Sequence, residues 1–156
     1  MDTNKRATNF SGLRLGSVVA TAAAVTLDAN RDSGKTFLTG VTTAQTFTLP
    51  AATGSNSVFT FIVTATATGN KIIQANNATD EFLGILTSID TDTSDAMATF
   101  AALPADNADT ITLNGTTTGG VGGDIITITD IAAGVYHLQG TTMASGVPST
   151  PLSAAV

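Results

Sequence analysis

Hydrophobic and polar residues alternate with a period of two over much of this chain. The clearest stretch covers residues 59–68, where Phe59, Phe61 and Val63 alternate mainly with threonines. Shorter stretches of the same kind cover residues 46–49, 110–114, 126–129 and 135–139. This period places apolar side chains on one face of a β-strand and hydroxyls on the other. The pattern therefore predicts antiparallel sheets that each have one solvated face.

Turn-forming residues separate these stretches. Glycine, proline, asparagine and aspartate cluster at residues 50–54, 69–70, 104–107, 114–115 and 119–123. Many short strands between such turns are typical of an all-β domain. The predicted fold is an antiparallel β-sandwich or barrel-like domain with extended N- and C-terminal arms. No long amphipathic helix is predicted, and Ser88–Ala102 is expected to be a strand-to-loop insertion.

The uneven distribution of charge divides the chain into three regions. Residues 1–16 form a basic N-terminal arm with Lys5, Arg6 and Arg14 against a single acid, whereas residues 17–156 carry 11 acids and three cations. We expect a β-domain at 17–140 and an extended C-terminal tail at 141–156. Each arm is either a loosely held chain end or a segment that docks on a partner.

Residues 16–25, GSVVATAAAV, allow three interpretations. The segment has the small apolar residues of a signal peptide, but Asp2 and Arg14 do not fit the flanks of one. Its alanines would suit a short helix. The β-branched Val18, Val19 and Val25 favour an extended conformation, which is the interpretation we adopt.

Composition excludes several functional classes. The chain contains no cysteine, so a disulfide scaffold, a zinc finger and a thiol nucleophile are excluded. A pI near 4.3 argues against nucleic acid as a partner, and no apolar stretch is long enough to span a membrane. With 30 threonines and 24 alanines the core is thin, so association with a partner would add stabilising burial.

Two segments imitate ligand-binding motifs. Ser33-Gly34-Lys35-Thr36 resembles the end of a phosphate-binding loop, but Ala29 replaces the first glycine and a strand follows. Asp90, Asp92 and Asp95 resemble the start of a calcium loop, although the required glycine and bidentate glutamate are missing. An irregular cation site or a solvated acidic loop are the two interpretations left open for these aspartates.

Two further candidates for catalysis are weak. His137, the single histidine, has no G-x-S-x-G nucleophile elbow to serve and is expected to be exposed or at an interface. Asp80 or Glu81 paired with Asp90 or Asp124 would supply two carboxylates for glycoside hydrolysis, but aromatic platforms for sugars are lacking. We therefore predict no catalytic, cofactor-binding or metal-ligating residue, and no enzyme.

Several segments resemble a module of tailed-phage structural proteins, notably the capsid decoration (cement) proteins. They are DSGKTFL at 32–38, FTLPA at 47–51, FTFIV at 59–63, TGNKII at 68–73, DEFLG at 80–84, DIITITD at 124–130 and GVYHL at 134–138. The resemblance covers about residues 25–140.

The resemblance implies a virion protein on the outer surface of the capsid. Such a protein binds the major capsid protein, bridges coat subunits and is commonly a homo-oligomer, with a trimer favoured. Lys5, Arg6 and Arg14 are the expected docking residues for acidic coat surface. A phage head-fibre or tail-spike module, and a surface carbohydrate-binding or adhesion module, are the alternatives.

Overall fold

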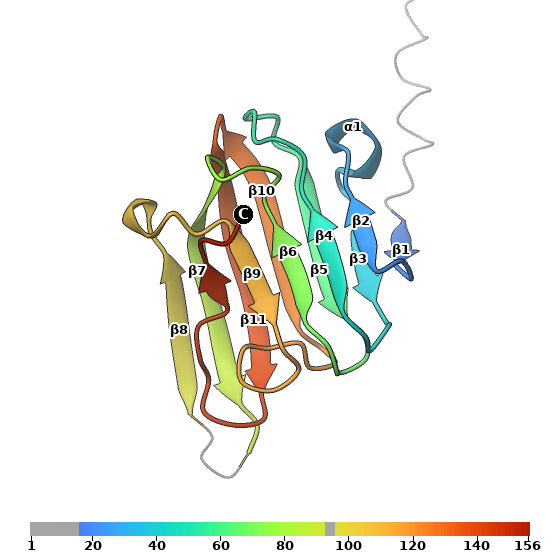
Figure 1. Ribbon diagram of the computed structural model, residues 1–156, viewed down its shortest axis with the longest axis vertical. Coiled ribbons are helices and arrows are strands. Elements are labelled where there is room, and N and C mark those ends of the chain that lie inside the picture. Colours follow the sequence, from blue (N-terminus) through green and yellow to red (C-terminus); the bar gives the residue numbers. More distant parts are fainter. Residues whose placement is uncertain (1–15, 93–95) are drawn as a thin grey trace, which may run out of the picture.

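Two β-sheets face each other in the computed structural model, which describes residues 16–92 and 96–156 (Figure 1). The seven-stranded sheet has the strand order β1 (Ser17–Val19), β3 (Thr36–Thr39), β5 (Val58–Val63), β10 (Ile125–Ala132), β11 (Val135–Ala144), β7 (Glu81–Asp90) and β8 (Met97–Ala102). The five-stranded sheet has the order β12 (Leu152–Ser153), β9 (Thr110–Leu113), β6 (Lys71–Gln74), β4 (Gln45–Thr48) and β2 (Ala24–Thr26). The described helices are the short α1 (Ala29–Asp32) and η2 (Pro104–Asp106).

The predicted all-β sandwich is confirmed, but the sheets are mixed rather than antiparallel. Strands β1, β3 and β5 run parallel to one another, as do β2, β4 and β6, and β11 runs parallel to β7. The cause is the path of the chain, which alternates between the two sheets from β1 to β6. A strand that returns after one crossing runs in the same direction as its neighbour, and period-two alternation does not report this.

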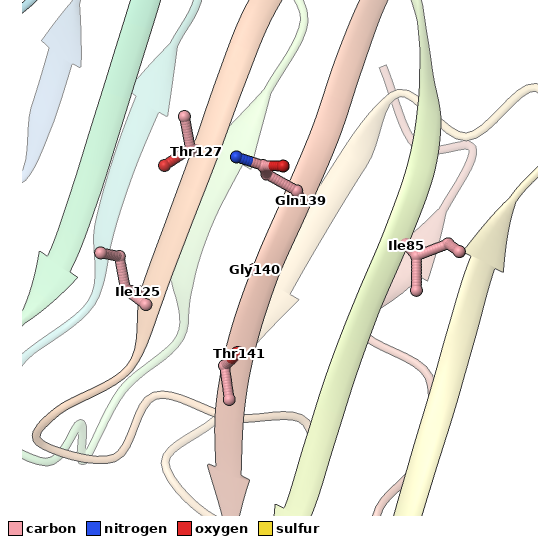
Figure 2. A pocket seen from close by; sticks show the side chains of 6 residues that line it. All are labelled: Ile85, Ile125, Thr127, Gln139, Gly140 and Thr141. Carbon is pink, nitrogen blue, oxygen red and sulfur yellow. The ribbon is translucent and has the colours of Figure 1, made fainter.

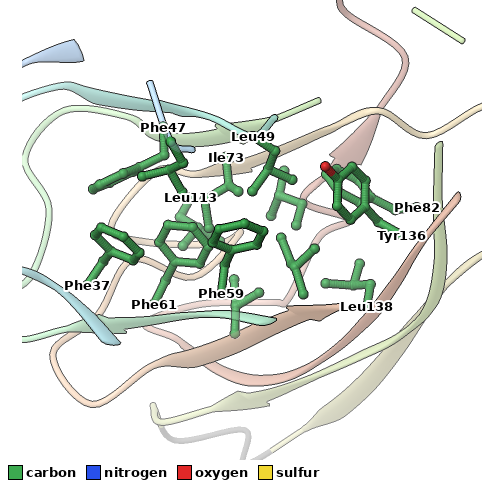
Figure 3. Close-up of a cluster of buried hydrophobic side chains, with 14 of the residues drawn as sticks. Phe37, Phe47, Leu49, Phe59, Phe61, Ile73, Phe82, Leu113, Tyr136 and Leu138 are labelled. Carbon is green, nitrogen blue, oxygen red and sulfur yellow. The ribbon is translucent and has the colours of Figure 1, made fainter. Parts of the chain in front are cut away.

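Aromatic rings from both sheets fill the core (Figure 3). The ring of Phe61 lies 5.1 Å from that of Phe47 and 5.5 Å from that of Phe37, measured between centroids. Phe82 and Tyr136 form a second pair at 6.1 Å. Aromatic pairs at such distances add stability beyond the area that they bury. The predicted inward positions of the alternating segments are confirmed, because their large apolar side chains are buried.

Three segments differ from the sequence prediction. The alternating stretch 59–68 is a strand only as far as Val63, where β5 ends. Ser88–Ala102 is no loop insertion: β7 runs to Asp90 and pairs with β8 in an antiparallel hairpin. The usual polarity is reversed there, since Ser88 and Asp90 are buried and Ile89 is exposed. Residues 141–144 belong to β11, and the tail beyond them returns as β12 along the edge of β9. The extended conformation expected near residues 16–25 is confirmed by β1 and β2.

Candidate interaction surface

The outward face of the seven-stranded sheet carries a broad uncharged surface, which we call the open face. It consists of the outward side chains of β5, β10, β11, β7 and β8. Strand pairing aligns them in rows: Ile62, Ile125, Thr141, Thr87 and Thr99 form one row, and Thr60, Thr127, Gln139, Ile85 and Ala101 form the next. Residues far apart in the sequence thus become neighbours.

Large aliphatic side chains on the open face are unusually exposed. Met97 is 71%, Ile85 53%, Ile89 42% and Ile125 41% accessible. Among the outward residues of its five strands, Glu81 at one end is the one charged side chain. A protein surface is normally rich in lysine and glutamate, so a sheet face that exposes isoleucines and a methionine among threonines, with almost no charge, is a candidate interaction site.

A shallow hollow of about 380 Å³ lies within the open face (Figure 2). Its walls come from Ile125 and Thr127 on β10, Gln139 and Thr141 on β11, and Ile85 on β7. Its floor includes Gly140, where a Cβ atom would lie 2.6 Å from the carbonyl oxygen of Ile125. No ionisable side chain lines the hollow. It is therefore suited to holding a side chain by burial and hydrogen bonds, and not to acid–base chemistry.

The aspartates that make the body acidic are used inside the fold. Asp130 at the end of β10 accepts hydrogen bonds from the backbone N–H groups of Thr53, Gly54 and Ser55 and from the hydroxyls of Thr53 and Ser55. Burial raises the pKa of Asp130, but the hydrogen bonds from Ser55, Thr53 and Gly54 outweigh it and hold the pKa below its ordinary value. Through these hydrogen bonds Asp130 fixes the 53–55 loop to β10. We call a buried aspartate that fixes a loop in this way a clamp.

Asp124 clamps a second set of turns. It is 1% accessible and accepts from the backbone N–H groups of Gly120, Val121 and Met143. Burial raises the pKa of Asp124 to about 6, although these three hydrogen bonds oppose the rise. Asp124 ties the glycine-rich turn before β10 to the end of β11, so its proposed role in glycoside hydrolysis has no support from its surroundings.

Three more buried aspartates have the same kind of role. Asp80 accepts from the backbone N–H of Ala52, and Asp109 accepts from those of Ala155 and Val156 near the end of the chain. Asp32 accepts from the backbone N–H of Asp28, at the start of α1. These carboxylates hold loops and the terminal segment, which explains how an acidic protein has a sheet face almost without charge.

A buried lysine on β6 also has a structural role. Lys71 is 1% accessible and donates hydrogen bonds to the backbone carbonyls of Val41 and Thr43. Burial lowers the pKa of Lys71. Its ammonium group therefore fastens the 41–43 loop to β6 and is not presented to solvent as a nucleophile.

The segment that imitates a phosphate-binding loop is a turn into a strand. Gly34 adopts a φ of 77°, and β3 begins at Thr36, so no helix N-terminus follows the glycine. Lys35 Nζ lies 2.9 Å from Asp32 Oδ1. The hydrogen bond from Arg31 to Asp32, and then those from Lys35 and the Asp28 backbone, hold the pKa of Asp32 well below its ordinary value despite partial burial. The predicted strand after Thr36 is confirmed.

The other sequence candidates are dispersed. Asp90 is buried, Asp92 is exposed, and Asp95 lies outside the described residues. Within residues 16–92 and 96–156, no group of three or more acidic, histidine or cysteine side chains is placed to hold a metal ion. His137 is exposed on the open face, as predicted. Lys5, Arg6 and Arg14 lie outside the described residues, so their docking role stays a prediction.

Sequence reasoning missed the open face. One signal was present: Ile62 stands at a threonine position of the 59–68 pattern, and Ile125 precedes the inward Ile126. Strands with large aliphatic side chains on both faces are covered on both sides.

Comparisons with known proteins gave no match: no family model, no curated protein and no solved structure is similar to this chain at the threshold applied. In the described parts of the chain, no helix has the length and hydrophobicity to cross a membrane.

Proposed function

We propose that this chain is a structural protein that decorates the outside of a tailed-phage head, and that the open face contacts the coat. The observation that carries the proposal is an almost uncharged sheet face with exposed isoleucines and Met97. With about 3.3 Å per residue and about 4.8 Å between strands, the five strands of the open face cover roughly 600 Å². A stable interface buries about 800 Å² per partner, so the size is appropriate.

The chemistry of the open face suits repeated docking rather than turnover. Aliphatic and threonine side chains gain free energy when water is removed from them, and they need no particular charge on the partner. On a symmetric lattice each copy repeats the same contact, so modest affinities add when one protein bridges several subunits. The lattice that we propose is the coat of a tailed-phage capsid, because the sequence resembles capsid decoration proteins.

The other predicted features of this function remain predictions. A trimer, and contacts from Lys5, Arg6 and Arg14 to acidic coat surface, rest on the resemblance and on the sequence alone. Nothing described favours the carbohydrate-binding alternative, because the described aromatic side chains are buried apart from Phe100, which is half-buried. Sugar-binding sites use aromatic rings as exposed platforms.

Head occupancy tests the proposal. Purified heads of a tailed phage whose genome encodes this chain, stripped of this protein, are incubated with the wild-type chain or with Ile85→Lys, and bound copies are counted after sedimentation. Ile85 is exposed on the open face, so a lysine there leaves the fold intact but places a charge in the contact. We expect at least a tenfold loss of affinity, since an unpaired interfacial charge costs more than about 1.4 kcal/mol.

Ile72→Lys is the matched control. Ile72 points outward from the five-stranded sheet, and it is half-buried. We expect near wild-type occupancy for this variant. Equal losses for the two variants would contradict a coat contact at the open face. Failure of the wild-type chain to bind heads at all would contradict the decoration role itself.

A further inference from the structure

Among residues 16–92 and 96–156, no strand pairs with the outer side of β8, so one side of the seven-stranded sheet is open there. Strand β8 is hydrogen-bonded to β7 on one side, and it lies at the margin of the molecule (Figure 1). In an antiparallel ladder every second residue points its N–H and C=O groups away from the partner strand. Along its six residues β8 therefore directs a row of backbone donors and acceptors away from β7.

The other three edge strands are much shorter than β8. Strands β1 and β2 have three residues each and β12 has two. Proteins protect sheet edges with short strands, charged side chains, prolines or bulges. The sequence of β8, MATFAA, contains no charge, proline or glycine, and its pairing with β7 has no bulge. It has none of these protections, so it is a ready template for another strand.

A second observation concerns the inward face of β8. The five-stranded sheet ends at β12, and Phe100 on the inward side of β8 stays half-buried. A hollow of about 300 Å³ lies beside β8 and β12, with Ala101, Ala108 and Leu152 among its walls and the exposed Asp106 as its one charged lining residue. At β8, therefore, the outer backbone groups are not paired with another described strand, and the inward side chain of Phe100 is not fully covered.

We propose that β8 pairs with β8 of a second copy of this chain, antiparallel about a twofold axis at Thr99. The first argument for a second copy as the partner strand is the distribution of charge on the chain. The chain has a net charge of −6, so copies repel each other over most of their surface, but β8 itself bears no acid or base. A basic partner would meet no carboxylate on β8, whereas a second copy brings no like charge to it.

The strand is also complementary to itself. With Thr99 opposite Thr99 of the second copy, Met97 lies opposite Ala101 on the outward side. On the inward side Phe100 lies opposite Ala98. Each large side chain thus meets a small one, as cross-strand packing favours. The pairing joins two seven-stranded sheets into one, and the two open faces become continuous. It does not depend on the proposed decoration role.

The test is the oligomeric state of the full chain in solution, measured by sedimentation equilibrium over a range of concentrations. The wild-type chain is expected to form a dimer of twice 15.6 kDa. Thr99 is exposed, and across the twofold axis the Cβ atoms of the two copies would lie about 5 Å apart, so two like-charged side chains there would repel each other. Thr99→Lys and Thr99→Glu alone are therefore each expected to weaken dimerisation at least tenfold, and an equimolar mixture of the two is expected to restore it.

Thr26→Lys provides the matched control, because Thr26 is an exposed threonine on the edge strand β2. It should dimerise like the wild-type chain, and circular dichroism melting checks that each variant is folded. A wild-type monomer would overturn the proposal, and so would a wild-type trimer, which is the state that the resemblance implies. So would dimers of Thr99→Lys as tight as the wild type, or a mixture of the two variants that stays monomeric. No capsid is used, so these outcomes are independent of the proposed function.

Discussion

The two outward faces of the sandwich are both nearly uncharged, yet they differ in what they expose. On the five-stranded sheet, the strands β2, β4, β6 and β9 direct a threonine-rich set outward, which we call the threonine face: Ala24, Thr26, Thr46, Thr48, Ile72, Gln74 and Thr112. Its one large aliphatic side chain, Ile72, is half-buried. The open face instead exposes several isoleucines and Met97 by 41% or more.

This difference is the reason for placing the proposed coat contact on the open face. Threonine suits a solvated strand because its methyl group packs on the sheet and its hydroxyl meets water. An exposed isoleucine has no such compensation and gains most when a partner covers it. Both faces lack charge because the body's acids are largely engaged as clamps on loops.

Replacing Asp130 by alanine is expected to destabilise the fold most. The change leaves the backbone N–H groups of Thr53, Gly54 and Ser55 without their acceptor. Lost acceptors of this kind cost about 1–3 kcal/mol each when buried, and water replaces part of the loss at the exposed Thr53 and Ser55, so we expect a loss near the lower limit for three groups, about 3 kcal/mol, in the free energy of unfolding. Urea unfolding measures it. Asp106→Ala, at an exposed aspartate with one backbone hydrogen bond, should cost less than about 1 kcal/mol. Equal costs would show that Asp130 is no clamp.

The raised pKa of Asp124 predicts that the free energy of unfolding depends on pH. Its pKa is about 6 in the folded chain and 3.8 in the reference state. Since the folded pKa is the higher one, the contribution of Asp124 is fully present below pH 3.8 and is lost as the pH rises through 6. From about pH 4.5 to 7.5 we expect the wild type to lose about 2 kcal/mol relative to Asp124→Asn.

The pH range of 4.5 to 7.5 distinguishes the effect of Asp124 on stability from the effects of Asp32 and Asp130. The lowered pKa values of Asp32 and Asp130 add stability that is present above their unfolded value and is lost at more acidic pH. Urea midpoints of the wild type and Asp124→Asn across this window provide the measurement. A constant difference between the two proteins would contradict the raised pKa.

The smallest effect on the fold is expected from making the open face resemble the threonine face. In the double variant Ile85→Thr with Ile125→Thr, both changes are at exposed positions, so the free energy of unfolding should change by less than about 1 kcal/mol. Head affinity should fall about tenfold, because apolar area is lost from the contact. Ile72→Thr is the control and should leave affinity unchanged. Unchanged binding by the double variant would mean that the two faces are equivalent.

The sequence predicted the strands whose inward side chains are large and whose outward ones are polar. Phe47, Phe59, Ile128 and Leu138 fit that pattern, and the strands that contain them were identified. The β7–β8 hairpin was missed because Ser88 points inward and Ile89 outward, the reverse of the expected polarity. Parallel pairing was missed because alternation along one strand contains no information about its neighbour.

The candidate surface was less predictable than the fold. Its rows join residues from distant segments, such as Ile62, Ile125 and Thr87, and only the strand order brings them together. The clamping aspartates were interpreted as candidate chemistry, since sequence alone does not indicate that backbone N–H groups surround them.

The most direct test is an electron-microscopy reconstruction of purified heads of a tailed phage whose genome encodes this chain. The account predicts this chain on the outer surface in symmetric, stoichiometric copies, with Ile85 and Ile125 of the open face against the coat. A head that lacks the chain, or one on which the threonine face meets the coat while the open face stays in solvent, would contradict it.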